Sequence, residues 1–207
     1  MKQILNRASW HRNAHYEFFS QFEEPFFGIT VQVDVTRARI QAKERQESLF
    51  LYYLYQSLRA VNAVEPFRYR IEGEDVVVYD RVHASPTINR DNGSFGFAYM
   101  DFESAWTEFY QKAQLEADRV RSHNRLEPAT SAENVIHYSA IPWIHFTSLS
   151  HARAFSFRDS IPKISFGKII PQGDAYCMPV SVHAHHALMD GYDVGKMLDL
   201  FQQFLNE

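Results

Sequence analysis

The stretch of this sequence with the clearest chemical content ends in two adjacent histidines and an Asp-Gly pair. It reads Met178-Pro-Val-Ser-Val-His-Ala-His-His-Ala-Leu-Met-Asp-Gly191. Imidazole titrates close to neutral pH, so a histidine at the end of a strand can accept a proton and later return it. Asp190 can anchor the turn that follows, and Gly191 permits a turn that other residues could not make. The pattern therefore predicts that His186 is a general base presented at the edge of a sheet.

The same stretch leaves two other interpretations open. Strand alternation places Val182, Ala184 and His186 on one face, and His183 and His185 on the other. The latter pair could ligate zinc together with a nearby carboxylate, but no third ligand stands at a characteristic spacing. We therefore expect no metal. A surface histidine beside a turn is the other alternative.

The composition indicates a globular chain and excludes several classes of function. The 207 residues include 17 Phe and 11 Tyr, and 45% are hydrophobic. The net charge is −4, with Lys and Arg scattered along the chain, which argues against a nucleic-acid or membrane surface. There is a single cysteine, and neither a signal-peptide pattern nor a long apolar run, so we expect a cytoplasmic protein.

The hydrophobic periodicity predicts a mixed α/β arrangement in which helices cover a sheet. Ser48 is expected to break or recap the helical stretch from Thr36 to Ala63. Strands are predicted near Phe27–Val35, Phe67–Ile71, Asp75–Tyr79, Val82–Ile88, Phe95–Met100, Val135–Ile141, Ile161–Ile170 and Ala175–His185. Helices are predicted at Asn13–Phe22, over residues 103–121, and from Gly191 to the end of the chain.

Three motifs stand in order along the chain. Trp10-His-Arg12-Asn-Ala-His15-Tyr-Glu17 is near the start, Ser139-Ala-Ile-Pro-Trp143 lies in the middle, and the His186 stretch lies near the end. Together they resemble the motifs of the chloramphenicol acetyltransferase family, of the classical trimeric type. The resemblance implies one acyltransferase domain over residues 1–207, with the CoA-dependent acyltransferase fold. It also implies an acetyl-CoA-dependent O-acetyltransferase that acts on a small-molecule alcohol such as chloramphenicol.

The resemblance assigns roles to individual residues. His186 would deprotonate the acceptor hydroxyl, and Ser139 would donate a hydrogen bond to the oxyanion of the tetrahedral intermediate. Ser165 would assist through an ordered water. Asp190 would pair with Arg12 in a bidentate clamp that holds the turn presenting His186.

Further positions are assigned to substrate binding by the same resemblance. Lys168 would lie near the coenzyme, and Phe95 belongs to the same substrate-binding group. Four positions of the acceptor pocket differ from the family: Phe19 replaces a tyrosine, Glu127 replaces an aromatic residue, and Leu149 and His151 replace apolar or aromatic pocket residues. These differences leave the identity of the acceptor open.

The family works as a homotrimer with active sites at the subunit interfaces. This implies that His186 of one subunit faces Ser139 of its neighbour. Two rival functions remain at this point: another CoA-dependent acyltransferase, such as the catalytic domain of a dihydrolipoamide acyltransferase, and a binding protein that keeps the fold without turnover.

Overall fold

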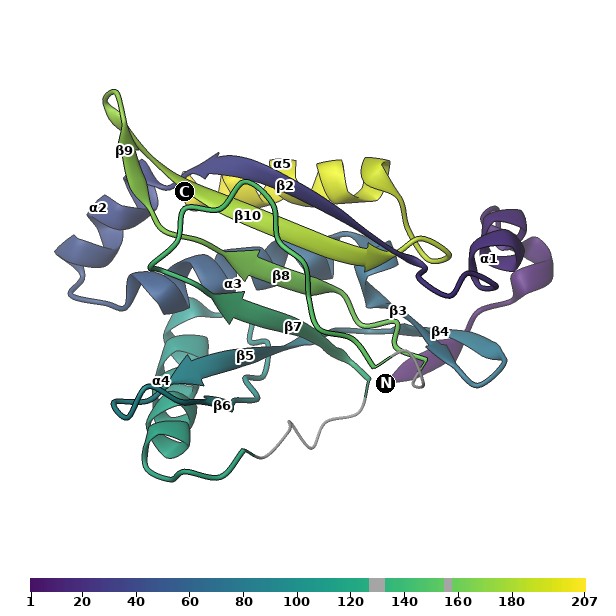
Figure 1. Ribbon diagram of the computed structural model, residues 1–207, viewed down its shortest axis with the longest axis horizontal. Coiled ribbons are helices and arrows are strands. Elements are labelled where there is room, and N and C mark those ends of the chain that lie inside the picture. Colours follow the sequence, from purple (N-terminus) through teal and green to yellow (C-terminus); the bar gives the residue numbers. More distant parts are fainter. Residues whose placement is uncertain (127–132, 155–157) are drawn as a thin grey trace.

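The computed structural model describes residues 1–126, 133–154 and 158–207 of the chain. Its main sheet is mixed, in the strand order β2-β10-β8-β7-β5-β6, with β9 paired to β10 (Figure 1). The strands are β2 (Phe26–Asp34), β5 (His83–Asn89), β6 (Phe95–Phe97), β7 (Val135–Ala140), β8 (Lys163–Phe166), β9 (Ile170–Gln172) and β10 (Ala175–His185). β7 runs parallel to β5 and β8, and the other pairs are antiparallel. The predicted strand Ile161–Ile170 is therefore two short strands, and most other predicted strands start or end a few residues away from the observed ones.

A second, three-stranded antiparallel sheet has the order β1-β4-β3. β3 (Tyr69–Glu72) and β4 (Asp75–Tyr79) form the predicted hairpin. β1 (Lys2–Ile4) was not predicted from the sequence, because all three of its residues are exposed and it is held by its pairing with β4.

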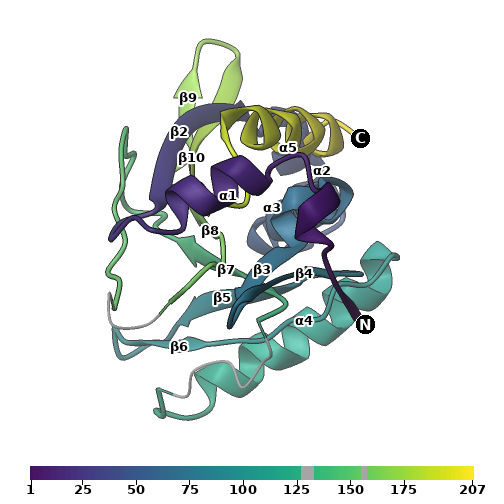
Figure 2. The same ribbon diagram turned by 90° about the vertical axis from the view of Figure 1, so that its right-hand side faces the viewer.

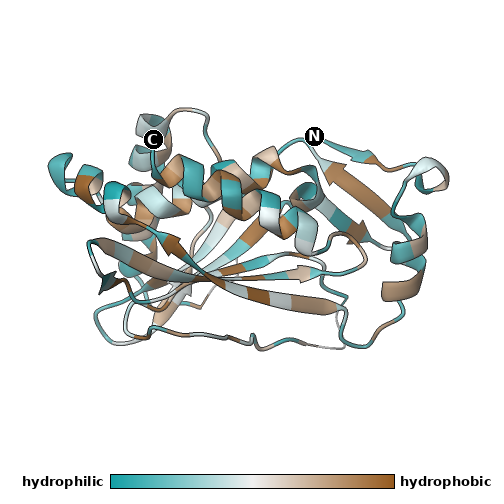
Figure 3. Ribbon diagram, turned by 90° about the horizontal axis from the view of Figure 1, so that it is seen from above, coloured by the Kyte–Doolittle hydropathy of each residue, from teal (hydrophilic) through white to brown (hydrophobic). Residues whose placement is uncertain are grey.

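Helices α3 (Leu49–Ala63), α4 (Trp106–Arg121) and α5 (Gly191–Leu205) cover one side of the main sheet (Figure 2). Apolar residues recur among polar ones along the helices (Figure 3), and α3, α4 and α5 each bury apolar residues. Leu54, Phe109 and Phe201 are fully buried where these helices meet the sheet. The remaining helical segments are α1 (Asn13–Phe19), α2 (Thr36–Glu44) and the 3-10 turns η1 (Arg7–Ser9) and η2 (Glu65–Arg68). No helix in the described part of the chain is long and apolar enough to cross a membrane.

Two helix ends illustrate how local sequence sets the elements. Ser48 caps α3, since its hydroxyl accepts the Leu51 N–H at 3.4 Å, so the predicted break at this residue is confirmed. α1 ends at Phe19 rather than at Phe22 as predicted. Phe22 instead turns back, with its N–H bonded to the Phe19 carbonyl at 3.2 Å and its ring 5.2 Å from that of Phe18.

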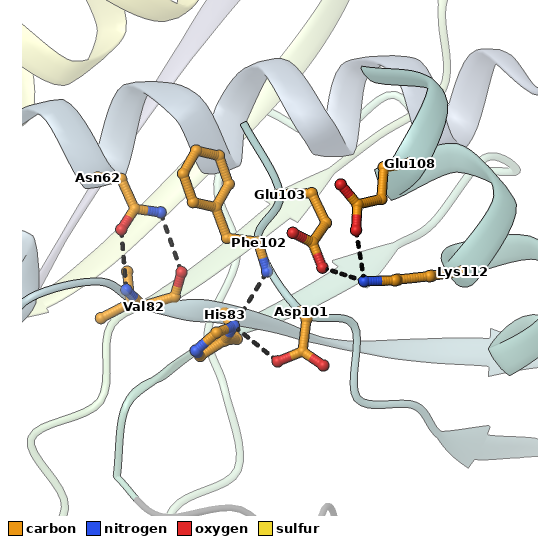
Figure 4. Close-up of polar contacts among 8 residues, drawn as sticks. All are labelled: Asn62, Val82, His83, Asp101, Phe102, Glu103, Glu108 and Lys112. Carbon is orange, nitrogen blue, oxygen red and sulfur yellow. Dashed lines mark hydrogen bonds and ion pairs between the residues drawn. The ribbon is translucent and has the colours of Figure 1, made fainter. Parts of the chain in front are cut away.

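Side chains at the end of α3 and the start of β5 join these elements (Figure 4). The Asn62 amide donates to the Val82 carbonyl at 2.9 Å and accepts the Val82 N–H at 2.8 Å. His83 Nδ1 accepts the N–H of Phe102 at 3.0 Å. These bonds fix the start of β5, the strand that pairs with β7.

The sheet face opposite the helices is crossed by the irregular segment that follows β7 (Figure 1). Its residues 141–154 pass over β8 and β10, and Phe146 is buried there. A Cβ atom on Gly167 would lie 2.9 Å from the Phe146 ring, so the close approach of this segment requires glycine.

Candidate active site

The end of β10 separates its histidines as strand alternation predicts. Val182 and Ala184 are fully buried in the core, while His183 and His185 lie on the opposite face. The strand ends at His185, and the N–H of His186 donates to the Pro25 carbonyl at 2.8 Å. His186 therefore begins the turn that leads to α5.

The imidazole of His186 is half-buried and is held by aromatic rings. The Phe19 ring stacks on it with a centroid distance of 4.0 Å and an interplanar angle of 6°. The Phe27 ring lies 4.7 Å away on a tilt of 44°. Nδ1 is buried and has no hydrogen-bond partner among the described residues.

Arg12 holds the turn that carries this histidine. Its guanidinium is buried, and Nη1 donates to Asp190 Oδ2 at 2.6 Å. Nη2 donates to the His186 carbonyl oxygen at 3.1 Å. The ion pair expected from the resemblance is present. The prediction that Arg12 binds both oxygens of Asp190 is wrong, because Nη2 donates to the His186 carbonyl. The other oxygen of Asp190 accepts a backbone N–H of α5 instead.

That other oxygen starts the last helix. Asp190 Oδ1 accepts the Tyr192 N–H at 2.9 Å, and the Asp193 side chain accepts the Asp190 N–H at 3.3 Å, which completes a capping box. Burial raises the pKa of Asp190, but the hydrogen bonds from Arg12 and Tyr192 outweigh it and bring that pKa below its ordinary value. The carboxylate thus stays ionised and joins α1, the turn and α5.

Ser139 and Ser165 lie side by side on the face of the sheet away from the helical core. They are direct partners in the parallel pairing of β7 and β8. Ser165 is fully buried, and Ser139 is half-buried. Ser165 Oγ lies 3.4 Å from Nε2 of His151, which comes from the irregular segment above.

Within one chain, the two serines and His186 are not brought together. Ser165 pairs with Ser181 of β10, and His186 is five residues farther along the chain. At about 3.3 Å per strand residue this is a separation of about 16 Å along the strand. One chain therefore holds His186 just beyond the end of β10 and the two serines beside the middle of the same strand.

The other predicted site residues are scattered around these two groups. Lys168 is exposed, and its N–H donates to the Ile144 carbonyl at 2.8 Å. Phe95 lies on the edge strand β6 and is 44% exposed. Leu149 is half-buried, and its backbone is hydrogen-bonded to the side chain of His183. Glu127 lies outside the described residues.

His183 and His185 do not form a metal centre with their described neighbours. Groups of three or more His, Cys, Asp or Glu side chains that could hold a metal ion are not found in residues 1–126, 133–154 and 158–207. Instead, His185 is buried, and its Nδ1 accepts the Ala187 N–H at 3.2 Å.

Two polar residues of this sheet face were missed in the sequence. His137 and Lys163 are direct partners of β7 and β8, one strand repeat before the two serines. The ammonium of Lys163 is ion-paired with Asp159. Burial, aided by the Lys163 charge, lowers the pKa of His137 to about 4. Period-two alternation back from Ser139 and Ser165 is the signal that could have identified both residues.

The similarity to known proteins extends over most of the chain. A family model described as chloramphenicol acetyltransferase matches residues 3–202. A chloramphenicol acetyltransferase of Klebsiella sp is 27% identical over 201 residues, which cover 97% of this chain and 92% of that protein. Chloramphenicol acetyltransferase 3 of Escherichia coli is also 27% identical, over 96% of this chain and 94% of its own length.

Solved structures agree with this match. A structure described as chloramphenicol acetyltransferase is 31% identical, with a TM-score of 0.91, and covers 99% of this chain and 100% of its own. The dihydrolipoamide acetyltransferase of Azotobacter vinelandii has a TM-score of 0.70 at 13% identity, over 94% of this chain and 86% of its own, which shows a shared fold.

Proposed function

This chain belongs to the chloramphenicol acetyltransferase family and is an acetyl-CoA-dependent O-acetyltransferase, and from this premise we propose how it transfers the acetyl group. We propose that His186 is the general base. Nε2 takes the proton of the acceptor hydroxyl while the oxygen attacks the thioester carbonyl carbon of acetyl-CoA. The C–S bond then breaks, and the imidazolium returns its proton to the thiolate of CoA.

The proposal assigns the oxyanion of the tetrahedral intermediate to Ser139. One donor of this kind contributes about 3 kcal/mol to the stabilisation of a transition state. Ser165, its direct cross-strand partner, supports an ordered water next to the same intermediate. We place Lys168 near the coenzyme, and Phe19, Phe95 and Leu149 around the acceptor. For Glu127, the acceptor-binding role stays a prediction from the sequence.

The separation of Ser139 from His186 within one chain supports a site shared between subunits. We propose a homotrimer in which His186 of one subunit meets Ser139 of the next. In this arrangement both halves of the site exist in every chain, but neither half is complete without a neighbour. The cytoplasmic location expected from the sequence is retained with this proposal.

The observation that carries the proposal is the position of the Arg12 guanidinium, which bridges the Asp190 carboxylate and the His186 carbonyl. This bridge fixes the backbone of the histidine and leaves its ring free of charge-assisted hydrogen bonds. A surface histidine beside an incidental ion pair has no reason to be held in this way.

The test is acetyl transfer by His186→Ala, with acetyl-CoA and chloramphenicol as substrates and release of the CoA thiol as the readout. General base catalysis is worth about 10²- to 10⁴-fold, so we expect kcat to fall at least a hundredfold. His15→Ala, which removes an exposed imidazole from α1, is the matched control and should retain wild-type activity. Activity of His186→Ala within tenfold of wild type would remove this residue from the mechanism. Binding of the coenzyme with no turnover of any alcohol would indicate a binding protein instead.

A further inference from the structure

The sheet face that carries Ser139 and Ser165 is polar over two complete cross-strand rows. Both rows cross four neighbouring strands from β2 to β7, on the side away from the helical core. The first row contains hydroxyl groups only, and the second contains two imidazoles and an ammonium group. The rows are Thr30, Ser181, Ser165 and Ser139, and Gly28, His183, Lys163 and His137.

These side chains are connected to one another and to the segment above them. The hydroxyls of Thr30 and Ser181 are 3.1 Å apart, and Ser181 Oγ is 3.4 Å from His183 Nδ1. The His151 ring meets the His183 ring edge to face at 4.8 Å, and it also contacts Ser165. His151 thus joins the two rows from above.

Glycine in β2 makes room for one of these imidazoles. A Cβ atom on Gly28 would lie 2.6 Å from His183 Nε2, a distance that no side chain at residue 28 could keep. The His183 ring therefore lies over the backbone of the neighbouring strand, in space left by the missing side chain.

Ser165, Ser181 and Lys163 are buried, so the half-buried members of the rows and His151 are the groups that can reach an acceptor. These exposed parts offer hydrogen bonds in both directions with little net charge. The Lys163 ammonium is neutralised by Asp159. Burial is the main cause that lowers the pKa of His137 and of His151 to about 4 and also lowers the pKa of His183. A neutral imidazole has one N–H donor and one acceptor nitrogen, and each hydroxyl both donates and accepts.

An apolar acceptor is a poor match for such a surface. Covering a polar group without replacing its hydrogen bonds costs about 1–3 kcal/mol per group, whereas a hydroxylated molecule can satisfy donors and acceptors together. Sites built from hydrogen-bonding groups discriminate strongly against analogues that lack the matching groups.

We propose that the acceptor of this enzyme is a neutral, polyhydroxylated molecule of the chemical class of sugars and sugar alcohols, and that His137, His151 and His183 determine this specificity. The inference rests on the proposed function, because that function places the reacting hydroxyl next to Ser139. The three imidazoles are half-buried around the two serines, so they lie where the rest of the acceptor must extend.

The first experiment compares acceptors for the wild-type enzyme with acetyl-CoA and thiol release as the readout. The probes are methyl β-D-glucopyranoside, methyl β-D-galactopyranoside, sorbitol, 3-phenyl-1-propanol and chloramphenicol. We expect kcat/KM for the best hydroxylated probe to exceed that for chloramphenicol and for 3-phenyl-1-propanol at least tenfold. A kcat/KM for chloramphenicol equal to or above that of every hydroxylated probe would overturn the proposal.

The second experiment changes the rows. The double variant His137→Phe/His151→Leu should raise kcat/KM for chloramphenicol at least tenfold and lower it for the best hydroxylated probe at least tenfold. Poor folding would lower both values, so opposite changes report on specificity alone. His11→Phe, which alters an exposed imidazole far from the rows in sequence, should leave the ratio unchanged. A ratio in the double variant within threefold of wild type would contradict the assignment.

A binding measurement separates this inference from the proposed function. Titration calorimetry of chloramphenicol and of methyl β-D-glucopyranoside into wild type and the double variant requires no turnover. If His186→Ala retains activity, the proposed base fails, but the calorimetric comparison still decides the acceptor class. Tighter binding of the glucoside to wild type, with the preference reversed in the double variant, supports the proposal. Chloramphenicol binding to wild type as tightly as the glucoside overturns it.

Discussion

Removing the Asp190 carboxylate tests whether the ion pair between Asp190 and Arg12, here called the clasp, positions His186. In Asp190→Ala, α5 loses its N-cap, which costs about 1 kcal/mol. The buried Arg12 guanidinium also loses its counter-charge. For a fully buried pair that loss costs about 3–5 kcal/mol. Because the Asp190 side chain is 36% exposed, water compensates part of it, and we take about 2 kcal/mol. The free energy of unfolding should therefore fall by about 3 kcal/mol.

The kinetic effect follows from the second bond of the same guanidinium. Without the carboxylate, Arg12 is no longer fixed, and its bond to the His186 carbonyl loosens. A displacement of about 1 Å at a catalytic group can cost about a hundredfold in rate. We expect kcat to fall between ten- and a hundredfold, with KM for acetyl-CoA little changed, since the carboxylate touches no part of the coenzyme in the proposal.

Two further variants separate the clasp from the helix cap. Asp193→Ala removes the reciprocal bond of the capping box and leaves Arg12 paired, so it should cost less than 1 kcal/mol and leave kcat intact. Asp190→Asn keeps an oxygen for Tyr192 but loses the charge, and should fall between the two in stability. Urea unfolding at one fixed protein concentration measures the stabilities, since assembly makes them concentration-dependent. If Asp190→Ala is no less stable than Asp193→Ala and its kcat stays within threefold of wild type, the clasp does not position His186.

Two more predictions concern the polar face of the sheet. Burial lowers the pKa of His137, His151 and His185 to about 4 from an ordinary value of 6.5, so between these values the unfolded chain binds protons that the folded chain does not. The free energy of unfolding is then greatest above pH 6.5, and it should fall by at least about 2 kcal/mol as the pH drops towards 4. The midpoints of urea unfolding at pH 7.0, 5.5 and 4.5 measure this fall. Equal midpoints at the three pH values would contradict the prediction. Ser139→Ala should lower kcat about a hundredfold with KM for acetyl-CoA within about twofold, measured by thiol release, and an unchanged kcat would exclude an oxyanion contact.

The features that could be predicted from the sequence are those set by neighbouring residues. The cap at Ser48 needs only a hydroxyl within reach of an N–H one turn ahead. The sides of β10 taken by Val182 and His183 follow from the period of two. The start of α5 at Gly191 follows from an aspartate that can cap the first turn. Each signal is complete within a few residues, so tertiary packing had little to change.

Features set by distant partners could not be predicted in the same way. β1 has no hydrophobic pattern and exists because β4 offers it a free edge. The resemblance implied the pairing of Arg12 with Asp190, but the division of the guanidinium between a carboxylate and a backbone carbonyl depends on how the turn after β10 is built. Likewise, the meeting of His137 with Lys163 depends on the register of two strands that are not adjacent in sequence.

The way in which His186 is held fits the general base that we propose. A nitrogen that must gain and lose a proton in each cycle cannot also be fixed by a strong hydrogen bond to that nitrogen, because the bond would favour one protonation state. Here orientation comes from elsewhere: the backbone is tied through Arg12, and the ring is aligned by stacking on Phe19 and contact with Phe27. Stacking restrains the plane of the ring without engaging Nε2, the nitrogen that exchanges the proton in our proposal. Phe19 restrains the ring by stacking alone, and stacking requires no hydroxyl group.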